Sequence, residues 1–184
     1  MKRDEAWAIL NEFTKSESLL KHALAVEAAM RHYVARSNED QDLWAITGLL
    51  HDFDYERWAN PPDHTREGAR ILRERGVEEE VVGAILSHAE WNQAEYPLDR
   101  PIRKTLFAVD ELSGFVTAVA YVRPEKLTGM SASSVRKKMK QKSFAAAVKR
   151  EDIEKGAELL GLTLDEHINN VIAALQSVGK GLGF

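Results

Sequence analysis

The chain has 184 residues, of which 44% are apolar and 29% are charged, a balance typical of a folded globular protein and not of a disordered one. Its net charge of −4 argues against a nucleic-acid partner. Cysteine is absent, which excludes disulfides, thiolate nucleophiles and cysteine-held zinc, so any metal site must use His, Asp or Glu.

Helical periodicity dominates the N-terminal part of the chain, and no segment has the pattern of a strand. A first short helix carries an apolar face that ends at Phe13. A second, longer helix begins near Ser16 or Ser18 and carries an apolar stripe as far as Tyr33. The segment Asp42–Leu50 is the most apolar of this region and predicts a buried central helix.

The middle of the chain alternates helices with two loops. Adjacent Pro61 and Pro62 disfavour a helix, and Gly76 is suited to end one. The predicted elements are a loop at 53–63, a helix at 65–75, a helix at 78–88, a loop at 91–101 and a helix at 102–122.

The C-terminal part is predicted to add a helical extension, about residues 131–177, to a core of about residues 18–122, and we expect one all-α domain over residues 1–184. The apolar residues of the last helix, such as Ile168, Val171 and Ile172, belong either to the core or to a homodimer face. The extension comprises a short basic segment at 131–142, helices at 150–160 and 163–175, and a glycine-rich tail at 179–184 that we expect to be frayed.

No export or membrane signal is visible. The first ten residues are charged and lack a long apolar run, and no stretch approaches the roughly 20 apolar residues that a membrane helix needs. We therefore expect a cytoplasmic protein with no membrane partner.

Four polar side chains occur where apolar helices would bury them. His51 and Asp52 follow the apolar run that ends at Leu50, Asp110 lies inside an apolar helix, and His22 lies close to an apolar face. A buried carboxylate is costly unless it is paired or bound to a cation, and a divalent metal is one remedy. Taken singly, each residue has a structural explanation, such as a hydrogen-bonded histidine or an aspartate that caps a helix. Together, on three helices, the four favour a metal centre.

The ordered set His22, His51-Asp52 and Asp110 resembles the HD superfamily of metal-dependent phosphohydrolases over about residues 18–120. The surrounding sequence is similar too: two leucines precede the doublet, His64 is followed by Gly68 and further small or apolar residues, and His88 stands in Ser-His-Ala-Glu. The resemblance implies a single-domain helical bundle with a central metal site.

In this family His22, His51, Asp52 and Asp110 would hold one metal. In members with two metals, Asp52 would bridge the ions, and the residues that match the second site are His64 and His88. The alternatives are that His64 caps a helix and that His88 is a surface residue at a helix end.

The sequence departs from the family pattern after the doublet. Many relatives continue with Ile-Gly-Lys, whereas this chain has Phe53-Asp54-Tyr55 and lacks that lysine. The Gly-Tyr-Pro signature of the cyclic-dinucleotide phosphodiesterases is also absent from the segment 91–96. The chain is thus similar to an uncharacterised, HDIG-like branch whose substrate the resemblance does not imply.

We expect hydrolysis of a phosphate ester, with a nucleotide or a related small phosphorylated metabolite as substrate. One or two divalent transition ions would activate water, and Mn, Fe, Zn, Co and Ni all suit such ligands. The residues expected to take part in catalysis are Asp52 and, as general acid or base, Asp54 or Glu56. Arg57, Lys104 and the basic run 136–142, including Lys137 and Lys138, are the candidate substrate-binding residues.

Two residue roles and two other functions remain open at this stage. The basic run is equally compatible with a solvated helix face, and Trp58 and Trp91 either stack on a base or pack in the core. The same ligands would serve a di-iron oxygenase, and a nucleotide-binding regulatory module without catalysis is the other alternative.

Overall fold

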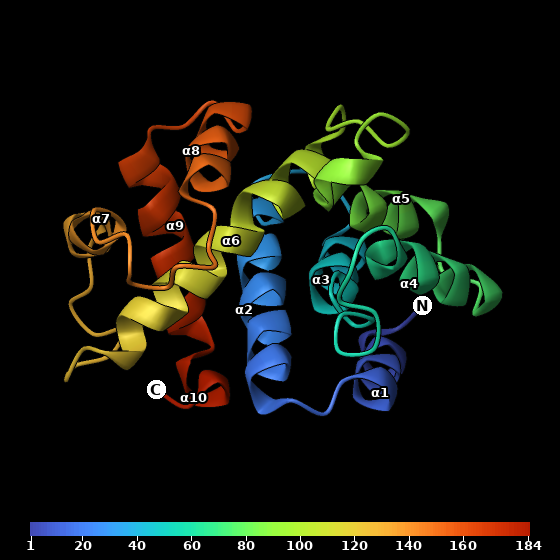
Figure 1. Ribbon diagram of the computed structural model, residues 1–184, viewed down its shortest axis with the longest axis horizontal. Helices are drawn as coiled ribbons and strands as arrows, with labels where there is room; N and C mark the ends of the chain where they lie inside the picture. Colours follow the sequence, from blue (N-terminus) through green and yellow to red (C-terminus); the bar gives the residue numbers. More distant parts are fainter.

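A computed structural model describes all 184 residues and consists of helices and loops, with no strand (Figure 1). The all-α fold class predicted from periodicity is therefore confirmed. In chain order the elements are α1 (Arg3–Phe13), α2 (Glu17–Val34), α3 (Gln41–Leu50), α4 (Asp63–Glu74), α5 (Glu79–His88), the short 3-10 helix η1 (Glu90–Asn92), α6 (Pro101–Tyr121), α7 (Ala132–Met139), α8 (Arg150–Leu159), α9 (Leu164–Ser177) and α10 (Gly179–Leu182).

The helices α2 and α6 pack against each other through the middle of the molecule. In Figure 1 the helices α1, α3, α4 and α5 lie to the right of this pair, and α7, α8, α9 and α10 lie to its left. Both halves of the chain therefore meet along α2 and α6, which carry two of the predicted metal ligands.

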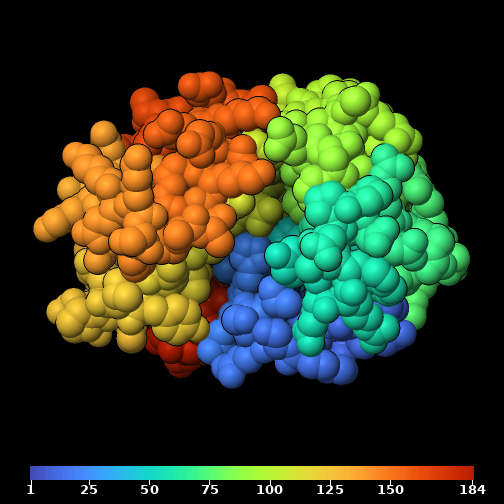
Figure 2. All heavy atoms as spheres, in the orientation of Figure 1, coloured from blue at the N-terminus to red at the C-terminus, as the bar shows by residue number.

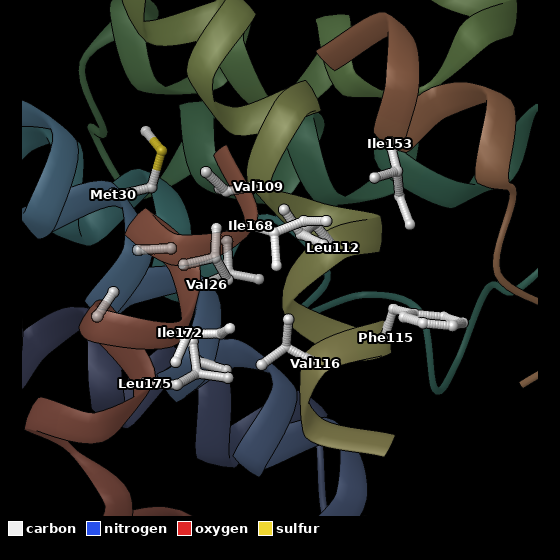
Figure 3. Packing of buried hydrophobic residues seen from close by; sticks show 14 of the residues in the cluster. Val26, Met30, Val109, Leu112, Phe115, Val116, Ile153, Ile168, Ile172 and Leu175 are labelled. Carbon is white, nitrogen blue, oxygen red and sulfur yellow. The ribbon is translucent and has the colours of Figure 1, made fainter. Parts of the chain in front are cut away.

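Two buried clusters correspond to the two sides of the molecule. One joins the inner faces of α1, α3, α4 and α5, and the other joins α2 and α6 to the C-terminal helices. Figure 3 shows this second cluster, to which α2 contributes Val26, α6 contributes Leu112 and α8 contributes Ile153. Ile168 and Ile172 of α9 are buried in it, as is Val171, so the core alternative holds for these three residues and the homodimer alternative does not.

A glycine lets α3 approach α2 closely. A Cβ atom at Gly48 would lie 3.0 Å from backbone atoms of Glu27 and 2.9 Å from Cγ of Met30, distances that a larger residue could not accept without displacement of α2. His51 is the C-cap residue of α3. The close approach therefore brings His51 next to α2 and to His22 on that helix.

A second glycine brings α8 against α6. A Cβ atom at Gly156 would lie 2.7 Å from Cα of Ala108, so α8 can occupy its place only with glycine at this position. The C-terminal helices thereby lie beside the part of α6 that carries Asp110.

The expectation of a frayed tail is wrong. Residues 179–182 form α10, and the side chain of Leu182 is fully buried in the cluster of α2, α6 and α9. The rings of Tyr121 and Phe184 pack edge to face with centroids 5.0 Å apart. Glycine-rich composition suggested disorder, but one buried leucine and one aromatic contact attach the tail to the core.

None of the helices combines the length and the apolar character required to cross a membrane.

Candidate metal centre

Four side chains from three parts of the chain converge at the first candidate site. His22 comes from α2, His51 and Asp52 follow α3, and Asp110 comes from the middle of α6. Each offers one donor atom, and these atoms all lie within 4.8 Å of one another. Oδ1 of Asp110 lies 2.9 Å from Nε2 of His22 and 3.3 Å from Nε2 of His51.

A second group of donors shares Asp52. Oδ1 of Asp52 lies 3.3 Å from Nε2 of His64 and 3.3 Å from Nε2 of His88, whereas Oδ2 faces the first group at 3.5 Å from Nε2 of His51. His64 lies just before the regular part of α4, and His88 ends α5. One carboxylate therefore stands between two sets of imidazoles, as a bridging ligand must.

Main-chain carbonyls orient two of the imidazoles. Nδ1 of His51 lies 2.8 Å from the carbonyl oxygen of Gly48, and Nδ1 of His88 lies 2.6 Å from that of Ile85. A carbonyl oxygen can only accept, so each Nδ1 carries the hydrogen and donates it. In the neutral ring each Nε2 then presents a lone pair toward the cluster, which is the state in which histidine binds a metal.

The donor atoms fit a cation better than they fit one another. Oδ1 of Asp52 is buried and makes no hydrogen bond, although two imidazole nitrogens lie close to it. The Nε2 atoms of His22 and His51 are only 3.2 Å apart. When both rings present lone pairs, such a close approach is repulsive, and an ion between the two nitrogens removes that repulsion. Each group offers two imidazoles with one or two carboxylates, a set that suits a divalent transition metal with open positions.

The electrostatics of the cluster also favour positive charge. Although burial opposes the charged form, the carboxylates of Asp52 and Asp54 raise the pKa of His64 to about 10. Burial likewise opposes ionisation of Asp52, yet His51, His64 and His88 hold the pKa of this carboxyl well below its usual range. The site is therefore arranged to keep its carboxylates ionised and to accept cations.

A cavity of about 470 Å³ opens onto these residues. Figure 2 shows the hollow at the centre of this face, between the segments near residues 60, 90 and 148. Candidate ligands form part of its wall. The rest of the wall comes from the segment between α3 and α4, from η1, from α6 and from the start of α8. The lining residues outside the ligand set are Leu19, Tyr55, Ala59, Pro61, Ala89, Glu90, Trp91, Phe107, Glu111, Gly114, Val148, Lys149 and Asp152.

Asp54 and Glu56 do not face this cavity, which corrects their expected role as general acid or base. Asp54 is 1% exposed, and its carboxylate accepts hydrogen bonds at the start of α4 and lies against His64. Glu56 is exposed and accepts the backbone N–H groups of Lys15 and Ser16, at the start of α2. Both residues follow the doublet closely, but the intervening turns point their side chains toward helix termini.

The expected substrate-binding cations are also elsewhere. Arg57 donates to the carbonyl oxygen of Glu12, and its guanidinium lies over the ring of Phe13 at 4.2 Å. Lys104 lies in the first turn of α6 and does not line the cavity. The residues Lys137 and Lys138 belong to α7 and do not line the cavity. A neighbouring hollow, which shares Val148 with the cavity, is lined instead by Arg136, Lys140 and Lys142 of the basic run.

Of the two tryptophans considered for base stacking, Trp91 is placed to contact a ligand and Trp58 packs in the core. Trp91 is 40% exposed and lines the cavity, with Tyr55 near it, and both rings lie within about 6 Å of the imidazole of His64. Trp58 packs on Phe13 and belongs to the core of the N-terminal side. Only Trp91 is therefore available to a ligand.

Sequence reasoning missed the polar residues that α6 and α8 contribute to the cavity. Burial, followed by the neighbouring carboxylate of Asp110, raises the pKa of Glu111 to about 7. Lys149, just before α8, pairs with Glu90 at 3.5 Å. Asp152 lies in the first turn of α8, and burial raises its pKa as well. Glu111 was visible as a second acid inside an apolar helix, whereas Lys149 and Asp152 carry no local signal.

Comparison with known proteins agrees with this arrangement. The model of the HD domain family matches residues 19–114, which is more than half of the chain and includes all six candidate ligands. No solved structure matches the chain significantly. The order of the ligands in the sequence, their convergence in the structure and this match lead to one conclusion, that the chain belongs to the HD domain family.

Proposed function

We propose that this protein is a metal-dependent hydrolase of small phosphate esters with a binuclear centre. The observation that carries the proposal is the position of Asp52, whose two carboxylate oxygens face different groups of ligands at the wall of a cavity. His22, His51, Asp52 and Asp110 would hold one ion, and Asp52, His64 and His88 would hold the other.

Divalent ions bound here would lower the pKa of a water molecule and neutralise charge on a phosphoryl group. The protein supplies the remaining functions. Lys149, at the cavity wall, attracts the anionic substrate, and Glu111 is placed beside the ligand Asp110 to exchange a proton with the leaving group. Glu111 thus takes the acid–base role that Asp54 and Glu56 cannot take from their positions.

The cavity limits the size and character of the substrate. A volume of about 470 Å³ lies in the lower part of the range for small-molecule sites and accommodates a mononucleotide or a smaller phosphorylated metabolite. The exposed rings of Tyr55 and Trp91 at the wall offer faces on which a planar base can stack. These contacts favour a nucleotide among the phosphate esters.

The test combines metal content with turnover. Protein purified without chelator should contain close to two transition ions per chain by elemental analysis and should release phosphate from a panel of nucleoside monophosphates and sugar phosphates. Chelation should abolish release, and added Mn²⁺ or Fe²⁺ should restore it. Asp42→Asn, at an exposed position in the first turn of α3, provides a matched control that should change neither quantity.

Three results would overturn the proposal. Absence of metal after incubation with manganese or iron would exclude the mechanism. Iron-dependent oxygen consumption without phosphate release would identify a di-iron oxygenase on the same ligands. Nucleotide binding without turnover in the metal-loaded protein would identify a regulatory module.

A further inference from the structure

The most completely hydrogen-bonded carboxylate near the site belongs to Asp54, which is not one of the candidate ligands. Its side chain is 1% exposed. Oδ2 accepts the backbone N–H groups of Thr65 at 2.8 Å and Gly68 at 3.1 Å, and Oδ1 lies 3.1 Å from Nδ1 of His64. The carboxylate therefore joins the start of α4 to the far side of a ligand imidazole.

The backbone around Asp54 is arranged to permit these contacts. Thr65 has a φ of +66°, a left-handed conformation that a β-branched residue rarely adopts. The side-chain amide of Asn92 donates to Oγ1 of Thr65 at 2.7 Å and helps to hold that conformation. A Cβ atom at Gly68 would lie 2.8 Å from Oδ2 of Asp54, so the carboxylate reaches α4 only because this residue is glycine.

Among the candidate ligands, His64 differs from the other two imidazoles whose Nδ1 atoms have partners. The Nδ1 atoms of His51 and His88 face neutral main-chain carbonyls, whereas Nδ1 of His64 faces the carboxylate of Asp54. A carboxylate behind a metal-binding imidazole fixes its tautomer and ring orientation and makes its other nitrogen a better donor to the metal. His64 needs such a partner because its own backbone is extended, at φ −55° and ψ 134°, and not part of a regular helix.

We propose that Asp54 is a positioning residue that holds His64 in the tautomer with hydrogen on Nδ1, so that the Nε2 lone pair faces Asp52 and binds the second ion. The inference rests on the proposed binuclear centre and adds a residue to it. It also accounts for an acid at the position where many relatives have glycine, because here the residue serves an imidazole and not a substrate.

Asp54→Asn tests the inference through the chemistry of the amide. An amide has one acceptor oxygen, and if that oxygen faces the two backbone N–H groups, the NH₂ group faces His64. Nδ1 of His64 must then accept, the proton moves to Nε2, and the nitrogen that faces Asp52 can no longer bind a metal. We expect the apparent Kd of the second Mn²⁺ ion to rise about 10- to 100-fold, with the first ion unchanged.

Asp40→Asn is the matched control for replacing a carboxylate with an amide at the start of a helix. Asp40 accepts the backbone N–H groups of Asp42 and Leu43 at the start of α3, on the surface, and contacts no histidine. Because asparagine caps a helix about as well as aspartate, the control should change the melting temperature little, and both ions should bind normally. Gly68→Ala, which crowds the same carboxylate without removing it, should weaken the second ion in the same direction.

A double variant separates positioning from a general structural effect. If Asp54 acts through His64, adding Asp54→Asn to His64→Ala should cause no further loss of metal, as titration calorimetry with Mn²⁺ would show. A wild-type protein that binds no second ion would overturn the proposed function and this inference together. A normal two-ion wild type whose Asp54→Asn variant also binds two ions with unchanged Kd would overturn this inference alone.

Discussion

Replacement of Asp52 by asparagine should remove both ions, and no other single substitution in the site should do so. Oδ1 of Asp52 faces His64 and His88, and Oδ2 faces the group that contains Asp110. Asparagine keeps the shape but offers one neutral oxygen. By contrast, Asp110→Asn should affect only the first ion, and His64→Ala should affect only the second.

The size of the effect follows from the charge that is lost. Unit charges about 4 Å apart interact by about 4 kcal/mol at an effective dielectric constant of about 20, and the interaction with a divalent ion is larger. About 4 kcal/mol corresponds to roughly a thousand-fold in Kd for each ion. At metal concentrations that just saturate the wild type, Asp52→Asn should therefore contain essentially no metal.

Elemental analysis after gel filtration gives the number of ions bound per chain, and an assay of phosphate release gives the activity; together they test this prediction. Circular dichroism should show the same helix content for the variant and the wild type, because Asp52 lies at the cavity wall and not in either hydrophobic cluster. Retention of both ions would remove Asp52 from the ligand set. Loss of exactly one ion would show that its carboxylate serves a single ion and that the bridging geometry is wrong.

Three further predictions concern pH, packing and substrate binding. Because the folded-state pKa of His64 is raised from 6.5 to about 10, its contribution to the stability of the metal-free protein should be fully present below pH 6.5 and should be lost as the pH rises toward 10. Melting curves in chelator should show this decline between pH 6.5 and about 10, and curves in Mn²⁺ should not, since metal binding strengthens as protons leave. Gly156→Ala should destabilise the fold by a net amount of up to about 2 kcal/mol, because about 1–3 kcal/mol of overpacking against Ala108 outweighs a gain of about 1 kcal/mol in helix propensity. A urea midpoint above that of the wild type would contradict the close contact. Lys149→Ala should raise KM for a phosphorylated substrate about tenfold with metal content intact, whereas Lys137→Ala should leave KM unchanged. The reverse result would show that the substrate binds at α7.

The helices and the candidate ligands could be predicted from local pattern. Apolar residues at helical spacing identified the segments that became α2, α3 and α6, since burial of one face is a property of each helix separately. The candidate ligands stood out because His51, Asp52 and Asp110 interrupt apolar runs, and a polar group in such a place needs a partner. The resemblance to the HD superfamily then supplied His64 and His88, which have weaker local signals.

The rest of the cavity could not be predicted, because side-chain direction in a turn and contact between distant helices are not local properties. Nearness to the doublet suggested catalytic roles for Asp54 and Glu56, yet the turns after α3 direct both side chains to helix termini. Lys149 lies far from the ligands in sequence and reaches the cavity only because α8 packs on α6 at Gly156.

The sequence alone thus determined the all-α class and the residues of the candidate metal site, both of which follow from the cost of burying polar groups and exposing apolar ones. Only the tertiary structure decided which acids and cations face the cavity and which support the scaffold. Helix packing sets those positions, and it depends on side-chain shapes at contacts such as Gly48 with α2 and Gly156 with α6. These contacts join residues far apart in the chain, so no local sequence pattern predicts them.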